Sequence, residues 1–230
     1  MQTITSIAAL VFVLVAQAPS HTAVLSRYIE ALGGETALRA IRSRITEGQF
    51  DNGRGLETRF RTYDQAPNKR TTIIGTAAIE DAAGSGRGYD GAAGWDKNFI
   101  GTGRRALAGS ELAAVAREAD LLRPLHLLDD CQSPRVESDA QHDVVICQTA
   151  SGTRTRLHFD RQTGLLAQQE TDIGNGRSTR LTFEDYRLVD GVRLPFRTRI
   201  VLPGAAVSYT TESVRHNVSI DERVFQTPSS

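Results

Sequence analysis

Residues 179–200 read TRLTFEDYRLVDGVRLPFRTRI and carry the clearest structural signal in the chain. From 179 to 183, and again from 192 to 200, every second side chain is apolar or a threonine, and the positions between them are mostly polar. This alternation is typical of a β-strand with one buried face, and Asp190-Gly191 between the two stretches favours a hairpin turn. The segment therefore predicts two antiparallel strands with one apolar face and one face rich in arginine.

The same period of two continues on both sides of this hairpin. The residues Asp51-Asn52-Gly53 predict the turn of another hairpin over roughly 43–65. Further stretches with strand character are 71–74, 143–149, 153–160, 165–171 and about 206–220. Together they predict an antiparallel meander of nine or more strands joined by hairpins. The run Gly84–Gly88, GSGRG, lacks the Lys-Ser/Thr ending of a phosphate-binding loop, and we expect a flexible turn there.

Helical spacing of apolar residues is confined to three segments. Val24–Leu32 is followed by Gly33-Gly34 as a stop, a second short helix is expected over 35–41, and a third over 110–122 ends before Pro124. Three short helices cannot cover so wide a sheet held flat, so the sheet is expected to curl and leave an apolar cavity. The predicted fold class is α+β, mainly β, with an open, curved antiparallel sheet wrapped around a few helices.

The N-terminus has the features of an export signal. Residues 4–18 are apolar, and Ala16-Gln17-Ala18 matches the small-x-small pattern of a cleavage site, although Pro19 leaves the exact point of cleavage open. We expect residues 1–23 to be a signal peptide and 24–230 to form one domain. The protein is then periplasmic or secreted, and a retained membrane anchor is the alternative.

The charge balance restricts the class of partner. The 27 basic and 27 acidic residues cancel, which argues against nucleic acid. The basic residues are nearly all arginine, since lysine occurs only at Lys69 and Lys97. This bias has two explanations: a GC-rich genome, or recognition of anionic head groups by bidentate guanidinium pairing. Outside the cytoplasm, Cys131 and Cys147 can form a disulfide worth about 3 kcal/mol.

The sequence lacks the common catalytic patterns. The five histidines are His21, His126, His142, His158 and His216. They form no HxH, HxxH or HExxH pattern, and no GxSxG elbow occurs. Asp129-Asp130 and Glu184-Asp185 are adjacent, so on an extended chain their side chains face opposite sides. We therefore predict no catalytic residue, no metal site and no cofactor, and a binding or carrier protein rather than an enzyme.

A set of short motifs occurs in the order typical of one protein family. The motifs are Tyr28-Ile29-x-Ala31-Leu32-Gly33-Gly34, Pro67-Asn68-Lys69-Arg70, Tyr89-Asp90-Gly91-x-x-Gly94-Trp95, Leu107-x-Gly109-x-Glu111-Leu112, Phe159-Asp160-x-x-Thr163-Gly164-Leu165-Leu166 and Asp185-Tyr186-Arg187-x-Val189-Asp190-Gly191-Val192-x-Leu194-Pro195. In this order they resemble the LolA/LolB-like superfamily of periplasmic lipoprotein carriers, and more closely its divergent outer-membrane lipoprotein-sorting relatives. The resemblance covers nearly all of residues 24–230.

The resemblance implies a half-barrel whose concave apolar face holds acyl chains or another hydrophobic ligand. The expected lining residues are Phe60, Trp95, Leu157, Phe159, Leu181, Phe183, Leu194 and Phe196. In the carriers an arginine commonly precedes the Pro-Asn pair, whereas this chain has Ala66 there. We therefore expect a binder of a hydrophobic ligand, and whether it transfers lipoproteins is left open by this departure. The expected partner is a lipid or a lipid-modified protein, bound by a monomer.

A second hypothesis assigns the chain to a different class of protein. A non-carrier module of the cell envelope would dock a protein partner through its arginine-rich face or a sheet edge. Side chains would then fill the concave face, and Arg197 and Arg199 would be needed to capture the partner.

Overall fold

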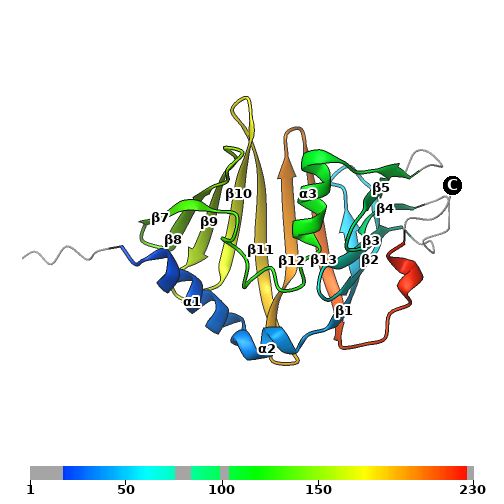
Figure 1. Cartoon of the computed structure of the whole chain (residues 1–230), viewed down its shortest axis with the longest axis horizontal. Coiled ribbons are helices and arrows are strands. Elements are labelled where there is room, and N and C mark those ends of the chain that lie inside the picture. Colours follow the sequence, from blue (N-terminus) through cyan, green and yellow to red (C-terminus); the bar gives the residue numbers. More distant parts are fainter. Residues whose placement is uncertain (1–17, 76–83, 99–103, 227–230) are drawn as a thin grey trace, which may run out of the picture.

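Thirteen antiparallel strands form one continuous sheet in the computed structural model, which describes residues 18–75, 84–98 and 104–226 (Figure 1). The strands are β1 (Ser43–Asp51), β2 (Glu57–Gln65), β3 (Lys69–Ile74), β4 (Ser85–Tyr89), β5 (Gly94–Lys97), β6 (Arg105–Ala106), β7 (Gln132–Ser138), β8 (His142–Gln148), β9 (Arg154–Asp160), β10 (Leu166–Gly174), β11 (Arg177–Val189), β12 (Val192–Leu202) and β13 (Ala205–His216). They lie in the order β6-β5-β4-β3-β2-β1-β13-β12-β11-β10-β9-β8-β7. The sheet therefore keeps two free edges, β6 and β7, and the predicted open antiparallel sheet is confirmed.

Hairpin turns set the register of this sheet. At the turn between β11 and β12, Asp190 and Gly191 have φ angles of 48° and 84°. Two consecutive positive φ angles match the right-handed twist of the flanking strands, which explains why Asp-Gly occupies this turn. The register that follows pairs Leu181 with Ile200 and Phe183 with Thr198. Each pair lies on one face of the sheet.

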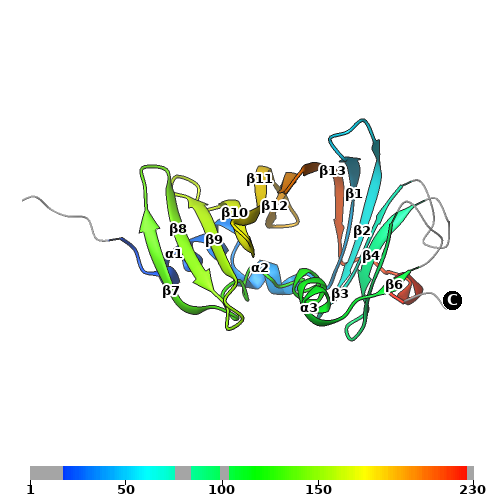
Figure 2. The same cartoon turned by 90° about the horizontal axis from the view of Figure 1, so that it is seen from above.

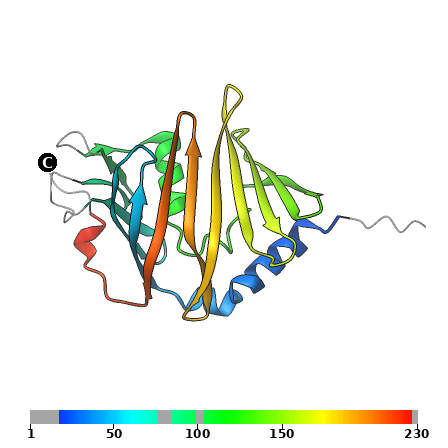
Figure 3. The same ribbon diagram turned by 180° about the vertical axis from the view of Figure 1, so that it is seen from behind.

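The three α-helices lie on one side of the sheet. They are α1 (His21–Leu32), α2 (Glu35–Ala40) and α3 (Gly109–Glu118), and a short 3-10 helix, η1 (Glu222–Val224), follows β13. The Ser20 hydroxyl accepts a hydrogen bond from the Ala23 backbone N–H at 3.2 Å and caps α1. Figure 2 shows that the sheet arches over the three α-helices, and we call the side that faces them the concave side. The opposite, convex side is seen in Figure 3.

Two clusters of buried apolar side chains fill the ends of the arch. The larger lies beneath α1 and contains Val24, Tyr28, Leu32, Leu38, Ile41, Leu121, Val145, Leu157, Phe159, Leu166 and Val192. The smaller lies beneath α3 and contains Tyr89, Leu107, Val115 and Ala119. The helices therefore cover the two ends of the concave side and not its whole width.

The third helix was expected over 110–122 but ends at Glu118, and the rest of the connection from α3 to β7 was not assigned a structure from the sequence. Residues 119–131, which we call the strap, cross the concave side of the sheet as a series of turns (Figure 1). Leu121 is buried in the larger cluster, and Leu125, Leu127 and Leu128 pack against it. The strap thus adds apolar cover that the three predicted helices could not supply.

The expectation of a flexible turn at residues 84–88 was wrong, because Ser85–Tyr89 forms β4. The reason is the side chain of Trp95, which is 1% exposed. A Cβ atom at Gly88 would lie 2.6 Å from the Trp95 ring, and one at Gly86 would lie 3.3 Å from it. The glycines here make a flat strand surface on which an indole lies.

The N-terminal expectations fall partly outside the described residues. Residues 1–17 of the expected signal peptide are not described, and α1 begins at His21, before the expected domain start at residue 24. Within the described part of the chain, every helix is too short or too polar to cross a bilayer.

Candidate ligand-binding face

The concave side can be followed strand by strand from the pairing register. Leu157 is buried beneath α1 and pairs with Gln169 of β10, which pairs with Leu181 of β11. The row continues through Ile200 of β12 to Val207 of β13. Because directly paired residues share a face, all five side chains point to the concave side.

A second row lies next to the first. Phe183 pairs with Thr198, which pairs with Tyr209, and Tyr209 pairs with Phe50 of β1. The Tyr209 ring contacts two aromatic neighbours, with its centroid 5.1 Å from those of Phe50 and Phe60. These tilted and edge-to-face contacts fix the ring between β13 and the first hairpin.

We define the concave strip as five side chains from the two rows. They are Leu181, Phe183, Ile200, Val207 and Tyr209, and each is only half-buried. The packing of α1 falls on β7, β8 and β12, and that of α3 on β4 and β5. The strip lies between these two covered ends. Apolar side chains that face the inside of an arch and remain half-exposed offer a surface to an apolar ligand.

The rim beside the strip also carries exposed apolar side chains. Ile173 and Leu202 stand at the tips of the β10–β11 and β12–β13 hairpins and are 44% and 41% exposed. Leu202 shares the alternation of Ile200 and so faces the concave side, whereas Ile173 lies at a register shift between Asp172 and Gly174. The apolar surface of the strip therefore extends to the tip of the β12–β13 hairpin.

The predicted lining residues occupy three different environments. Leu181 and Phe183 lie in the concave strip, and Phe60 lies beside it, buried against Tyr209. Leu157 and Phe159 also point to the concave side, but they are 2% and 0% exposed, beneath α1. The Phe159 centroid is 5.2 Å from that of Tyr28. These two residues are core rather than surface.

The remaining three predicted residues differ from one another. Leu194 packs partly buried against the larger cluster. Phe196 is 6% exposed and lies beneath the Arg187 guanidinium, 4.5 Å from its ring centroid. Trp95 needs a correction: it pairs with Gly88 on the face opposite Gly94, whose nearest side chains are Val115 and Leu112 of α3. It therefore lies on the convex side and cannot line the concave face.

Sequence reasoning missed three members of the strip. Ile200, Val207 and Tyr209 lie on stretches that were assigned as strands, but they were not selected as lining residues. The alternation already placed Ile200 with the apolar positions of its strand. For Tyr209 no local signal existed, because its contacts come from β1 and β2, about 150 residues earlier in the chain.

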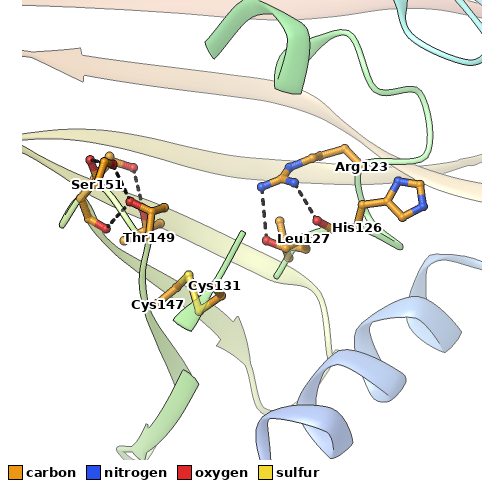
Figure 4. The surroundings of a disulfide bond; sticks show 10 residues. Arg123, His126, Leu127, Cys131, Cys147, Thr149 and Ser151 are labelled. Carbon is orange, nitrogen blue, oxygen red and sulfur yellow. Dashed lines mark hydrogen bonds between the residues drawn. A yellow bond between two sulfur atoms is a disulfide. The ribbon is translucent and has the colours of Figure 1, made fainter. Parts of the chain in front are cut away.

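The strap is fastened to β8 at its C-terminal end (Figure 4). Cys131 and Cys147 form a disulfide with their Cα atoms 5.3 Å apart, which joins the end of the strap to β8. Arg123 donates to the carbonyl oxygens of His126 at 2.7 Å and Leu127 at 3.2 Å. Burial lowers the pKa of Arg123, and nearby carboxylates, Asp130 first, oppose that shift.

Two buried carboxylates lie on the concave side. Asp64 on β2 is 1% exposed and pairs with both Arg44 and Arg70, at 2.9 Å each. Asp143 on β8 is also 1% exposed and lies 2.5 Å from Arg27 of α1. Burial raises the pKa of Asp143, but hydrogen bonds from Arg27 and Ser138 outweigh this effect and hold the pKa below its usual value. The Asp143 carboxylate is therefore charged within the fold at neutral pH.

The convex side carries the arginines that the sequence placed on the exposed face. Many of them lie next to carboxylates, as in Arg59–Glu212 at 3.0 Å and Arg197–Glu184 at 3.6 Å. Among the described residues, no group of three His, Cys, Asp or Glu side chains could hold a metal ion. His142 and His158 approach each other on this side, with ring centroids 5.9 Å apart.

Comparisons with known proteins support the architecture. No family model and no curated protein matches the chain. Among solved structures, it is similar to the LolA superfamily protein NE2245 from Nitrosomonas europaea, with a TM-score of 0.58 and 13% identity over 91% of this chain and 99% of that chain. It is also similar to a DUF1329 family protein from Desulfovibrio piger, with a TM-score of 0.61 and 14% identity over 91% of this chain and 98% of that chain.

A third similarity is weaker. The complex of MucA and MucB from Pseudomonas aeruginosa contains a chain that matches at 11% identity over 85% of this chain and 99% of that chain, but its TM-score of 0.27 is too low to support an argument. The first two similarities show that the protein has a divergent LolA-like fold.

Proposed function

We propose that this protein binds a hydrophobic ligand, such as the acyl chains of a lipid or a lipid-modified protein, on its concave strip. The observation that carries the proposal is the strip itself: five apolar or aromatic side chains face the inside of the arch and stay half-exposed. Burying acyl surface against them is favourable by about 0.8 kcal/mol per methylene group. The LolA-like fold is consistent with a carrier of this kind.

The proposal includes export to the periplasm. It is supported by the apolar stretch at residues 4–18 with its small-x-small motif and by the disulfide between Cys131 and Cys147. Disulfides persist in oxidising compartments. A carrier there would take an apolar ligand across an aqueous space that separates two membranes.

The alternative, a protein-docking module that uses the arginine-rich face, has less support. Arg59, Arg61 and Arg197 on the convex side each lie within 4 Å of a carboxylate, so much of the positive charge is compensated within the chain. Exposed pairs of this kind contribute little to binding or stability. The half-exposed strip also argues against a concave face filled by side chains.

The proposal is tested by measuring bound lipid and apolar dye. We would express the full precursor in a Gram-negative host, purify the mature protein from the periplasm, and examine it by native mass spectrometry and solvent extraction. We expect acyl-chain mass near one ligand per protein, or binding of a fluorescent fatty acid after delipidation. A protein that is empty and binds no such probe would overturn the proposal.

A matched pair of variants locates the site on the strip. Leu181→Asp places a charge on the concave side of β11 and is expected to weaken probe binding at least about tenfold, because a buried charge opposes apolar contact. Thr182→Asp changes the next residue, which faces the convex side beside Arg199, and is expected to leave binding within about twofold. Circular dichroism and urea unfolding of both variants show whether the fold is intact.

A further inference from the structure

We propose that Arg44 and Arg70 form a binding site for the anionic head group of an amphiphile whose apolar part lies on the concave strip. The inference rests on the proposed function and adds the class of ligand, a carboxylate or phosphate joined to an acyl chain. It also assigns the recognition of anionic head groups to two particular arginines, which the composition of the sequence could not do.

The two guanidinium groups converge on a single carboxylate. Arg44 comes from β1 and Arg70 from β3, and Asp64 lies between them on β2. The Arg70 Nη1 atom donates to Asp64 Oδ1 at 2.9 Å, and the Arg44 Nε atom donates to Asp64 Oδ2 at 3.0 Å. Two arginines around one aspartate leave a net positive charge. The arrangement also shows that the groups can hold a carboxylate between them.

Part of this hydrogen-bonding capacity is unused within the described part of the chain. Besides Asp64, Arg70 reaches only the Glu118 carbonyl oxygen, at 3.3 Å, again through Nη1. No hydrogen bond joins Arg44 Nη1, or Arg70 Nε and Nη2, to a described residue. The side chains are 20% and 31% exposed, so solvent reaches both guanidinium groups. These N–H groups can donate hydrogen bonds to a second anion while Asp64 keeps its own.

A buried histidine stands next to the pair. His216 of β13 is directly opposite Arg44 on β1 and faces the same side. Its side chain is 2% exposed, its Nδ1 lies 3.2 Å from Asp190 Oδ2, and its Nε2 has no hydrogen-bond partner in the described structure. A buried polar atom without a partner costs free energy, which a bound ligand can recover.

The pair is continuous with the concave strip. Asp64 follows Phe60 by four residues on the same face of β2, a distance of about 13 Å along the strand. Phe60 contacts the Tyr209 ring of the strip. Burial raises the pKa of Tyr209, and the charge of Arg70 opposes that shift, which indicates that the two side chains are near each other. A ligand with its head group at Arg70 can therefore place its chain on the strip.

The pair differs from the convex arginines in its setting. Asp64 is buried and the arginines are mostly covered, so an anion bound there is poorly screened by water. On the convex side, Arg59 and its partner Glu212 are 59% and 44% exposed. A head group is held more strongly in the first setting, because a charged hydrogen bond is stronger where water screens it less.

The test compares ligands that share a chain and differ in the head group. The delipidated full-length mature protein is loaded with the neutral dye 1-N-phenylnaphthylamine at pH 7.5, and the dye is displaced by palmitate, 1-palmitoyl lysophosphatidic acid or palmityl alcohol. We expect one or both anionic ligands to displace the dye at a concentration about tenfold lower than the alcohol. Preference for palmitate identifies a carboxylate site, and preference for the lysophospholipid identifies a phosphate site.

Two variants test the residues. Arg70→Gln is expected to lower the affinity for the anionic ligand about tenfold. The affinity for palmityl alcohol is expected to stay within about twofold of its original value. Arg61→Gln, which removes a convex guanidinium of β2 beside Glu47, is the control and is expected to change neither. Asp64→Asn removes the negative charge that offsets the two guanidinium groups, so the anionic ligand is expected to bind several-fold more tightly. A purely structural role for the cluster predicts no such gain.

The outcomes separate the two proposals. Equal displacement by palmitate, lysophospholipid and alcohol overturns the head-group site while the apolar site stands. Loss of alcohol binding in Arg70→Gln, or weaker anion binding in Asp64→Asn in a protein that remains folded, also overturns it. Failure of the dye and of all three ligands to bind overturns both proposals.

Discussion

Asp143 and Asp64 are two buried aspartates on the same side of one sheet, and their partners give them different roles. Each is 1% exposed. Asp143 is held by Arg27, which belongs to α1, so this pair joins a helix to the sheet. Asp64 is held by Arg44 and Arg70, which belong to the strands on either side of it. The Arg27–Asp143 pair fastens a helix to the sheet. The pairs of Asp64 join neighbouring strands and leave N–H groups of Arg44 and Arg70 available to a ligand.

The two halves of the sheet differ in the same way around these residues. Beside Asp143, the disulfide from Cys131 to Cys147 closes the strap onto β8. Beside Asp64, Arg70 contacts the end of α3 through one hydrogen bond to a backbone oxygen. The half around β8 is therefore fastened by a covalent bond and by an ion pair to a buried carboxylate, and the contact of Arg70 with α3 in the half around β2 is a single hydrogen bond.

Replacing both cysteines tests the covalent part of this difference and has the largest expected effect. Cys131→Ser with Cys147→Ala is expected to lower the free energy of unfolding by about 3 kcal/mol, since the bond closes a loop of 16 residues in sequence separation. Urea unfolding measures the loss. Hydrogen exchange should rise in β7, β8 and α1 more than in β1 and β2, and an equal rise in both halves would contradict the comparison.

Removing Arg27 tests the ion pair. Arg27→Met leaves the buried Asp143 carboxylate with Ser138 and, at 3.7 Å, Arg161. We expect a loss of about 2 kcal/mol, less than the value typical of a fully broken buried pair because these partners remain. Arg39→Met is the control, since Arg39 pairs with Glu35 on the surface of α2 and should cost about 0.3 kcal/mol. Equal losses in the two variants would show that the Asp143 pair does not hold α1.

Removing Arg70 is expected to cost less. In Arg70→Gln the Asp64 carboxylate keeps Arg44, so the free energy of unfolding should fall by about 1 kcal/mol. Urea unfolding beside Arg27→Met gives the comparison directly. If Arg70→Gln were the more destabilising variant, Asp64 would be a fastening point of the same kind as Asp143.

The sequence predicted what depends on local spacing. The alternation along residues 179–200 placed Leu181 and Phe183 on the concave side, because a strand turns each side chain to the face opposite its neighbour. Trp95 was assigned to the wrong side, since its face is set by pairing with Gly88 across a glycine-rich strand that was expected to be a turn. A run of glycines has no alternation of side chains, so the local sequence does not indicate a strand. The strand at Ser85–Tyr89 is explained by the Trp95 indole, which packs on the glycines.

The arginine pair could not be predicted from the sequence. Arg44, Asp64 and Arg70 come from three strands, and their contact requires the register of two hairpins. His216 joins them from a fourth strand, across a register shift between Glu47 and Gly48. Composition indicated only that arginine was unusually frequent.

Acid titration gives the smallest expected effect and the most specific test of Asp143. Because the pKa of Asp143 in the fold lies below its usual value of 3.8, the carboxylate contributes its full stabilisation at pH values above about 4. That contribution is lost as the pH falls through the pKa in the folded state. The stability difference between the natural protein and Asp143→Asn should therefore be constant from pH 7 to about 5 and shrink by about 0.5 kcal/mol between pH 4 and 3.

Urea unfolding at a series of pH values measures this difference, with Asp129→Asn, a change at an exposed position of the strap, as the control. A pH-independent difference for Asp143→Asn would mean that the side chain acts by shape and hydrogen bonding alone. A shrinking difference that disappears in Arg27→Met would trace the effect to the contact with α1. The pH dependence of the difference between the natural protein and Asp143→Asn then reports on the fastened half of the sheet, because the other carboxylates titrate alike in both proteins and cancel.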